Sequence, residues 1–105
     1  MTHADYVLVF KALADETRLK IVEMLSGGEL CACNILEQFK ITQPTLSYHM
    51  KTLCDCGLVT GRRDGAWMRY TINMEVFESV KELFGNLGFY EKDVGKEESC
   101  LTKCK

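Results

Sequence analysis

Residues 42–51 read Thr42-Gln43-Pro44-Thr45-Leu46-Ser47-Tyr48-His49-Met50-Lys51, and they have the marks of a helix start with a polar, hydroxyl-rich surface. Thr42 is a good N-cap, and Pro44 falls in the first turn, where its missing N–H costs nothing. Leu46 and Met50 are spaced i, i+4, so they share one face of this helix and are predicted to be buried. Gly57 suits the position just after the helix end, near Cys56.

A β-hairpin is predicted directly after this helix. From residue 58 to residue 72 the apolar period changes from helical to two, and Asp64-Gly65 interrupts the run. An Asp-Gly pair between two such segments favours a two-residue hairpin with a type I′ turn. Arg62 and Arg63 then lie beside the turn, and Trp67 and Tyr70 are expected to anchor the hairpin to the rest of the domain.

Four further helices are predicted where apolar residues recur at helical spacing. They cover residues 6–13, 17–26, 29–38 and 74–87. The first is expected to be short and buried, and Asp15 and Asn73 are expected to cap the second and the last. The helix over residues 29–38 would bury a face made by Leu30, Ile35, Leu36 and Phe39.

This order of elements predicts a mainly α fold with a β-hairpin wing, a winged helix-turn-helix. Residues 1–90 are predicted to form one folded domain. From residue 88 onward the pattern gives way to charged residues, Gly and Ser. Residues 91–105 are therefore expected to form a flexible tail that contains cysteines.

The helix at residues 42–51 and the wing carry the predicted DNA contacts. Residues 40–70 contain five basic and two acidic residues in a chain whose net charge is −2, so this segment forms a local basic surface. A recognition helix reads the major groove with its N-terminal part. The alternative interpretation of this helix is an ordinary solvated face without a DNA contact. Gln43 suits adenine, and Thr45 and Ser47 suit base edges or phosphates. The remaining predicted contacts are Tyr48, His49, Lys51, Arg62 and Arg63.

Six cysteines fall in three pairs, Cys31/Cys33, Cys54/Cys56 and Cys100/Cys104. The sequence shows no export signal and no apolar run long enough to cross a bilayer, so we expect a cytoplasmic protein without membrane association. Thiols in that compartment are reduced, which favours metal binding or redox sensing over a disulfide framework.

Cys31 and Cys33 are the leading candidates for metal ligands, the alternative being two small buried apolar side chains. On a regular helix, residues two apart point about 200° away from each other. Thiolates that share one ion at bond lengths of about 2.3 Å lie much closer than that geometry allows. Both residues lie on the helix predicted for residues 29–38, so ion binding must distort its first turn, and this distortion is expected to release DNA.

The chain resembles the ArsR/SmtB family of metal-responsive repressors. The resemblance rests on residues 29–33 (Glu-Leu-Cys-Ala-Cys), residues 43–51, Gly57-Leu58-Val59 and the Arg-Asp-Gly wing, and it spans about residues 5–87. It implies a homodimer formed by the first and last helices. It also implies an operator-bound repressor that leaves DNA when As(III) or Sb(III) binds Cys31 and Cys33, with Cd(II) or Pb(II) as the alternative inducer. Leu36 stands where some arsenic sensors of the family have a third cysteine.

The third ligand is left open by the sequence. Cys54 and Cys56 at the end of the recognition helix, Cys100 and Cys104 in the tail, or a group other than cysteine could supply it. A rival of the same class is a regulator in which Cys31 and Cys33 are oxidised. A rival of another class is a cytoplasmic metal-buffering protein. An enzyme is not expected, because the chain lacks a Cys-x-x-Cys motif and a phosphate-binding glycine loop.

Overall fold

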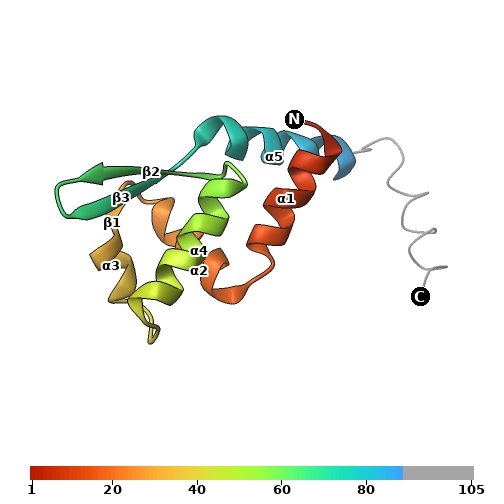
Figure 1. Cartoon of the computed structure of the whole chain (residues 1–105). Helices are drawn as coiled ribbons and strands as arrows, with labels where there is room; N and C mark the ends of the chain where they lie inside the picture. Colours follow the sequence, from red (N-terminus) through yellow and green to blue (C-terminus); the bar gives the residue numbers. More distant parts are fainter. Residues whose placement is uncertain (89–105) are drawn as a thin grey trace.

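The computed structural model describes residues 1–88, which fold into five helices and a three-stranded sheet (Figure 1). In chain order the elements are α1 His3–Leu13, α2 Glu16–Leu25, β1 Leu30–Cys31, α3 Ala32–Leu36, α4 Gln43–Asp55, β2 Val59–Asp64, β3 Trp67–Ile72 and α5 Met74–Gly88. The sheet is antiparallel with the strand order β1-β3-β2. The predicted winged helix-turn-helix is confirmed. The tail at residues 91–105 lies outside the described residues.

The helix starts follow local capping rules. Asp15 accepts a hydrogen bond from the backbone N–H of Arg18 at 3.0 Å and caps α2, as predicted. Asn73 Oδ1 accepts from the backbone N–H of Glu75 at 3.1 Å and caps α5, also as predicted. The first helix begins earlier than residue 6, because Thr2 and Asp5 form a reciprocal capping box.

The prediction that the first helix is buried is only half right. Val9 and Ala12 lie in the core, but Val7 and Leu8 on the other side of α1 are 45% and 53% exposed. The last helix runs beside α1 (Figure 1). The rings of Phe10 and Phe84 meet at a centroid distance of 5.6 Å, and the Tyr6 hydroxyl donates to the carbonyl oxygen of Ser79.

The predicted helix over residues 29–38 is wrong in its first turn and too long. Leu30 and Cys31 form a short strand that pairs with β3, with Leu30 opposite Tyr70 and Cys31 opposite Arg69. The helix that follows spans only Ala32–Leu36. A strand partner some 40 residues away in the chain cannot be read from local periodicity, so the tertiary contact overrides the helical pattern.

The hairpin turn lies one residue later than predicted. Asp64 pairs with Trp67 in the ladder, so the two turn residues are Gly65 and Ala66 rather than Asp64 and Gly65. Gly65 has a φ of +64°, whereas no residue other than glycine has a positive φ in residues 1–88. A type I′ turn needs a positive φ at both central residues, so glycine in the first position points to a type II′ turn.

The core is continuous from α1 to the sheet and holds α4 in place. Leu46, Met50 and Leu53 of α4 are at most 3% exposed. They pack with Ile21, Ile35 and Leu58 from the surrounding elements. This packing confirms that Leu46 and Met50 face inward, and it leaves the other side of α4 in solvent.

Candidate DNA interface and thiol site

The outward face of α4 carries most of the predicted base and phosphate contacts. Thr42 caps the helix by accepting from the backbone N–H of Thr45 at 3.3 Å. Five of the predicted contacts on α4 are exposed: Gln43, Thr45, Ser47, Tyr48 and Lys51. Lys51 forms a solvent-exposed ion pair with Asp55 at 2.9 Å, one turn further on. The structure therefore brings a row of polar side chains to one side of the helix.

His49 differs from its neighbours because it is half-buried and held by Arg18. The Arg18 guanidinium reaches His49 Nδ1 at 3.0 Å with Nη1, and its Nε donates to the carbonyl oxygen of Ala12 at 2.6 Å. A guanidinium only donates, so Nδ1 accepts and the proton of a neutral ring lies on Nε2. Arg18 thus joins α1, α2 and α4. Sequence reasoning missed this residue, since no spacing rule connects positions 18 and 49.

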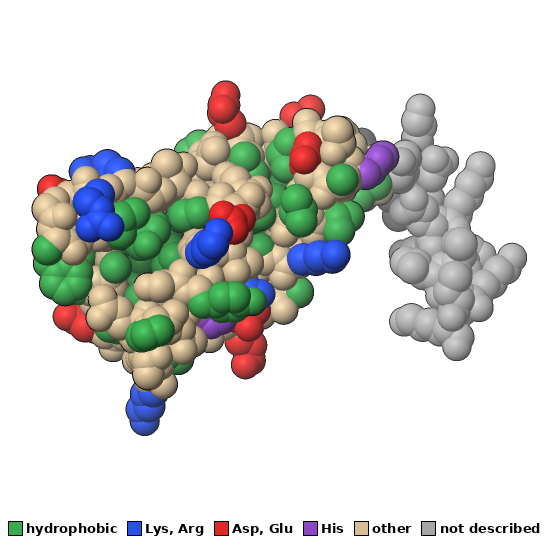
Figure 2. All heavy atoms as spheres, in the orientation of Figure 1, with side chains coloured by type: hydrophobic (Ala, Val, Ile, Leu, Met, Phe, Trp, Pro, Cys, Tyr) green, Lys and Arg blue, Asp and Glu red, His purple; other side chains and the backbone are tan. Residues whose placement is uncertain are grey.

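The arginine side chains of the wing differ in whether they are paired with a carboxylate. Arg62 makes two hydrogen bonds to the Glu29 carboxylate, at 3.0 and 3.2 Å. Arg69 pairs with Asp64 at 2.7 Å across the hairpin, which lowers the pKa of the Asp64 carboxyl. Arg63 faces the pocket between the wing and α4 and makes no ion pair within residues 1–88. Figure 2 shows basic side chains over the hairpin end of the molecule.

The Cys31 and Cys33 thiols are already adjacent. Cys31 is the N-cap of α3 with an extended backbone (φ −76°, ψ 147°), so the helical angle of about 200° does not apply. The two sulfur atoms lie 2.8 Å apart and share a hydrogen bond. The expectation that an ion must distort a helix to reach both thiols is therefore wrong.

The electrostatic surroundings make the two thiols unequal. Hydrogen bonds from the side chain and backbone of Cys33 lower the pKa of Cys31, and the Arg69 guanidinium adds a smaller effect in the same direction. Sharing its proton with Cys31 raises the pKa of the Cys33 thiol. Cys31 is 5% exposed and Cys33 is partly exposed, so an ion would approach from the side of Cys33. The thiolate is the form that binds soft ions.

Cys54 and Cys56 lie at the other end of α4. Burial raises the pKa of the Cys54 thiol, and the Cys56 thiol donates to the carbonyl oxygen of Leu53 at 3.2 Å. Within residues 1–88 no three His, Cys, Asp or Glu side chains gather in a group that could hold an ion. The structure does not join this pair to Cys31 and Cys33. Cys100 and Cys104 lie outside the described residues.

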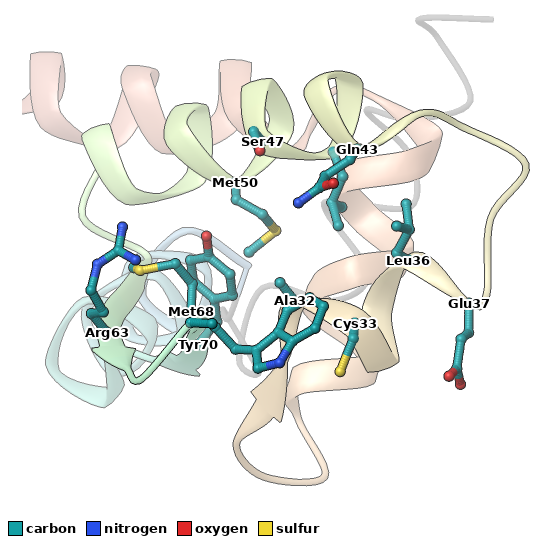
Figure 3. A pocket seen from close by; sticks show the side chains of 13 residues that line it. Ala32, Cys33, Leu36, Glu37, Gln43, Ser47, Met50, Arg63, Met68 and Tyr70 are labelled. Atoms are coloured by element: carbon teal, nitrogen blue, oxygen red, sulfur yellow. The ribbon is translucent and has the colours of Figure 1, made fainter.

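A pocket of about 500 Å³ opens between α3, the first half of α4 and the wing (Figure 3). Cys33 and Leu36 lie on the α3 side, and Arg63 and Met68 lie across from them on the wing. The lining also includes Gln43, Ser47 and Trp67. The thiol site and the candidate DNA interface therefore border the same cavity.

The comparisons with known proteins agree with this geometry. The family model of the bacterial regulatory proteins of the arsR family, a helix-turn-helix model, matches residues 15–60. The chain is 45% identical over 80 residues to an arsenical resistance operon repressor of Staphylococcus aureus, covering 76% of this chain and 77% of that protein. It is 43% identical over 72 residues to a probable mercury resistance operon repressor of Streptomyces lividans, covering 68% of this chain and 58% of that protein.

Solved structures share the fold. HlyU from Vibrio cholerae N16961 aligns with a TM-score of 0.66 and 33% identity, over 77% of this chain and 89% of that chain. None of the helices in residues 1–88 combines the length and apolar character needed to span a bilayer. With a recognition helix, a basic wing and this degree of identity to its relatives, the chain belongs to the ArsR family of bacterial regulatory proteins.

Proposed function

We propose that this protein is a cytoplasmic transcriptional repressor that binds operator DNA as a homodimer and leaves it when As(III) or Sb(III) binds Cys31 and Cys33. The observation that carries the proposal is the thiol pair, with its sulfur atoms 2.8 Å apart beside the candidate DNA interface. Soft ions prefer thiolate ligands. The arsenical resistance operon repressor of Staphylococcus aureus supports a metalloid inducer, and a regulator rather than an enzyme.

The wing connects the thiol pair to the proposed DNA interface. Cys31 is part of β1, which is hydrogen-bonded to β3, and the neighbouring Glu29 holds Arg62 of β2. An ion that changes the position of β1 therefore acts on the sheet that carries Arg62 and Arg63. The inducer favours one arrangement of this sheet and DNA favours the other, which couples the two binding events.

Dimerisation is proposed through α1 and α5. Val7 and Leu8 of α1 and Phe84 and Leu87 of α5 are between 45% and 62% exposed, and the two helices lie side by side at the end of the molecule opposite the wing (Figure 1). A second copy that covers this face would place two recognition helices on one duplex. Residues 1–90 would then be a single domain for DNA binding and dimerisation, with Cys100 and Cys104 as accessory ligands.

The test is release of the reduced protein from operator DNA by arsenite. Cys31→Ser and Cys33→Ser should each keep DNA affinity within about twofold and lose release, because one thiolate alone cannot chelate the ion. Cys54→Ser and Cys56→Ser are the matched controls and should still be released. Normal release of both the Cys31→Ser and the Cys33→Ser protein would place the inducer site elsewhere.

Two other inducers fit the same thiol pair. Cd(II) or Pb(II) is a second candidate, because soft divalent ions accept thiolates and the Streptomyces lividans relative is named for mercury resistance. Oxidation of the adjacent thiols to a disulfide is the third. Release by a mild oxidant without any added ion, reversed by a dithiol, would identify the redox regulator. Binding to operator DNA would distinguish all three kinds of regulator from a metal-buffering protein.

A further inference from the structure

The pocket beside Cys33 has features that binding a bare ion does not require. A bare metalloid ion occupies only the immediate neighbourhood of its thiolates, whereas this cavity has a volume of about 500 Å³. A cavity of roughly 150 Å³ already accommodates benzene. The pocket lies within the size range of small-molecule sites, and most of its lining is apolar or aromatic.

The pocket also lies directly beside the thiol pair. Cys33 belongs to the pocket wall, and Cys31 is 2.8 Å from it, sulfur to sulfur. Ala32 and Leu36 continue the wall along α3, and Trp67 and Met68 close it from the wing. Figure 3 shows the Cys33 sulfur at the rim of the cavity, so an arsenic atom bonded to Cys33 and to the adjacent Cys31 would lie at that rim.

We propose that the preferred ligand of this site is an organic trivalent arsenical with one aryl substituent, whose arsenic binds Cys31 and Cys33 while its ring occupies the pocket beside Trp67. The inference rests on the proposed function and names the ligand class of the same site. Two sulfur atoms and one carbon complete the three bonds of trivalent arsenic. The aromatic wall and the apolar lining provide the ring with contacts that arsenite cannot use.

The binding reaction balances without an oxidant. An aryl arsenical in its hydrated form carries two hydroxyl groups on arsenic. Two arsenic–oxygen bonds break and two arsenic–sulfur bonds form, and each thiol proton leaves with one hydroxyl as water. Arsenic stays trivalent and the carbon–arsenic bond is untouched. Ring binding also fills the space between Arg63 of the wing and Gln43 of α4, which both lie on the candidate DNA interface.

The experiment compares phenylarsine oxide with arsenite on the reduced full-length protein. Affinities are measured by equilibrium competition with dithiothreitol and followed by thiolate–arsenic absorption. Of the two residues expected to anchor the hairpin, Tyr70 is buried (8% exposed), whereas Trp67 is 49% exposed. Trp67→Ala should therefore fold normally. It should lower the affinity for phenylarsine oxide by about tenfold, as expected for the loss of an aromatic contact. Its arsenite affinity should stay within about twofold, and Trp67→Phe should retain most of the affinity for phenylarsine oxide.

A second variant tests the cavity itself. Leu36→Phe should fill the pocket and weaken phenylarsine oxide selectively, whereas Leu36→Ile keeps the volume and should not. Equal losses for both ligands, or no loss for either, in Trp67→Ala and Leu36→Phe would overturn the proposal. Unchanged phenylarsine oxide affinity in the Cys31→Ser/Cys33→Ser double variant would overturn it as well. If arsenite itself fails to bind through Cys31 and Cys33, the proposed function fails instead.

Discussion

The ion pair between Glu29 and Arg62 offsets part of the positive charge of the wing. In the free protein the Arg62 guanidinium is paired with the Glu29 carboxylate, whose side chain is 33% exposed. A phosphate contact by Arg62 therefore competes with an existing ion pair. Exposed pairs of this kind contribute about 0.2–1 kcal/mol, so the competition is a modest but measurable cost.

Glu29→Gln should strengthen DNA binding by about two- to fivefold, because Arg62 no longer leaves a carboxylate to reach a phosphate. Fluorescence anisotropy with a labelled operator would measure the change. Glu23→Gln, which removes the same charge from the exposed side of α2, is the control. In an Arg62→Ala background the gain from Glu29→Gln should fall to that of the control. A full gain in that background would show that Glu29 acts on DNA without Arg62.

Arg63 and Gln43 should have different roles although they line the same cavity. Arg63→Ala should weaken binding to all sequences and lower the slope of log affinity against log salt by about 1, the signature of one lost phosphate contact. Gln43→Ala should relax sequence preference at a cost of about 1–3 kcal/mol. Salt titrations with operator and scrambled DNA measure both effects. An unchanged salt slope in Arg63→Ala would remove this residue from the interface.

At the scale of elements, the stability of α2 depends on its N-cap residue, Asp15. The Asp15 carboxylate accepts the Arg18 backbone N–H, and this hydrogen bond lowers the pKa of Asp15. Asp15→Ala should cost about 1 kcal/mol in the free energy of unfolding at pH 7, whereas Asp15→Asn keeps an acceptor and should cost less. Urea unfolding at a fixed protein concentration provides the measurement.

The pH dependence of this cap has a definite sign. A carboxyl whose pKa is lower in the folded state stabilises the protein above its unfolded pKa of about 3.9. The contribution disappears as the pH falls through the lower folded value. The difference between the wild-type protein and Asp15→Ala should therefore shrink below about pH 3.9. A difference that grows with acidity would contradict the assigned role of the carboxylate.

The short strand β1 is the element on which the thiol site depends. It places Cys31 at the edge of the sheet, opposite Arg69, and turns the chain so that Cys33 begins the next helix beside it. The same strand leads from Glu29 to the pocket wall at Ala32 and Cys33. The ion pair to the wing, the thiol pair and the cavity wall thus involve five consecutive residues, 29–33, and no unwinding of a helix is needed to join them.

At the scale of the whole molecule, the exposed apolar face of α1 and α5 is expected to hold the dimer. Leu87→Glu should yield a monomer in sedimentation equilibrium, because a buried unpaired charge opposes association. Operator affinity should drop by about a hundredfold or more, since two half-sites no longer bind together. Leu19→Glu changes another exposed leucine, 50% exposed against 62% for Leu87, on α2 and should stay dimeric. A dimeric Leu87→Glu protein would place the interface elsewhere.

The sequence alone determined the features that depend on short-range contacts. Thr42, Asp15 and Asn73 each bond to backbone N–H groups two or three residues away, so the helix starts could be predicted from residue type and spacing. Leu46 and Met50 share a face by helical geometry, and the hairpin followed from its period of two. The recognition helix and the basic wing, and hence the family, rest on such local signals.

Tertiary structure alone decided how the candidate site is assembled. Leu30 and Cys31 form a strand only because β3 lies beside them, and that pairing brings the two thiols together. His49 is held by Arg18, 31 positions away, and Arg62 by Glu29, 33 positions away. The cavity exists only where α3, α4 and the wing meet. These contacts join residues far apart in the chain, so their partners are set by packing and leave no periodic signal in the sequence.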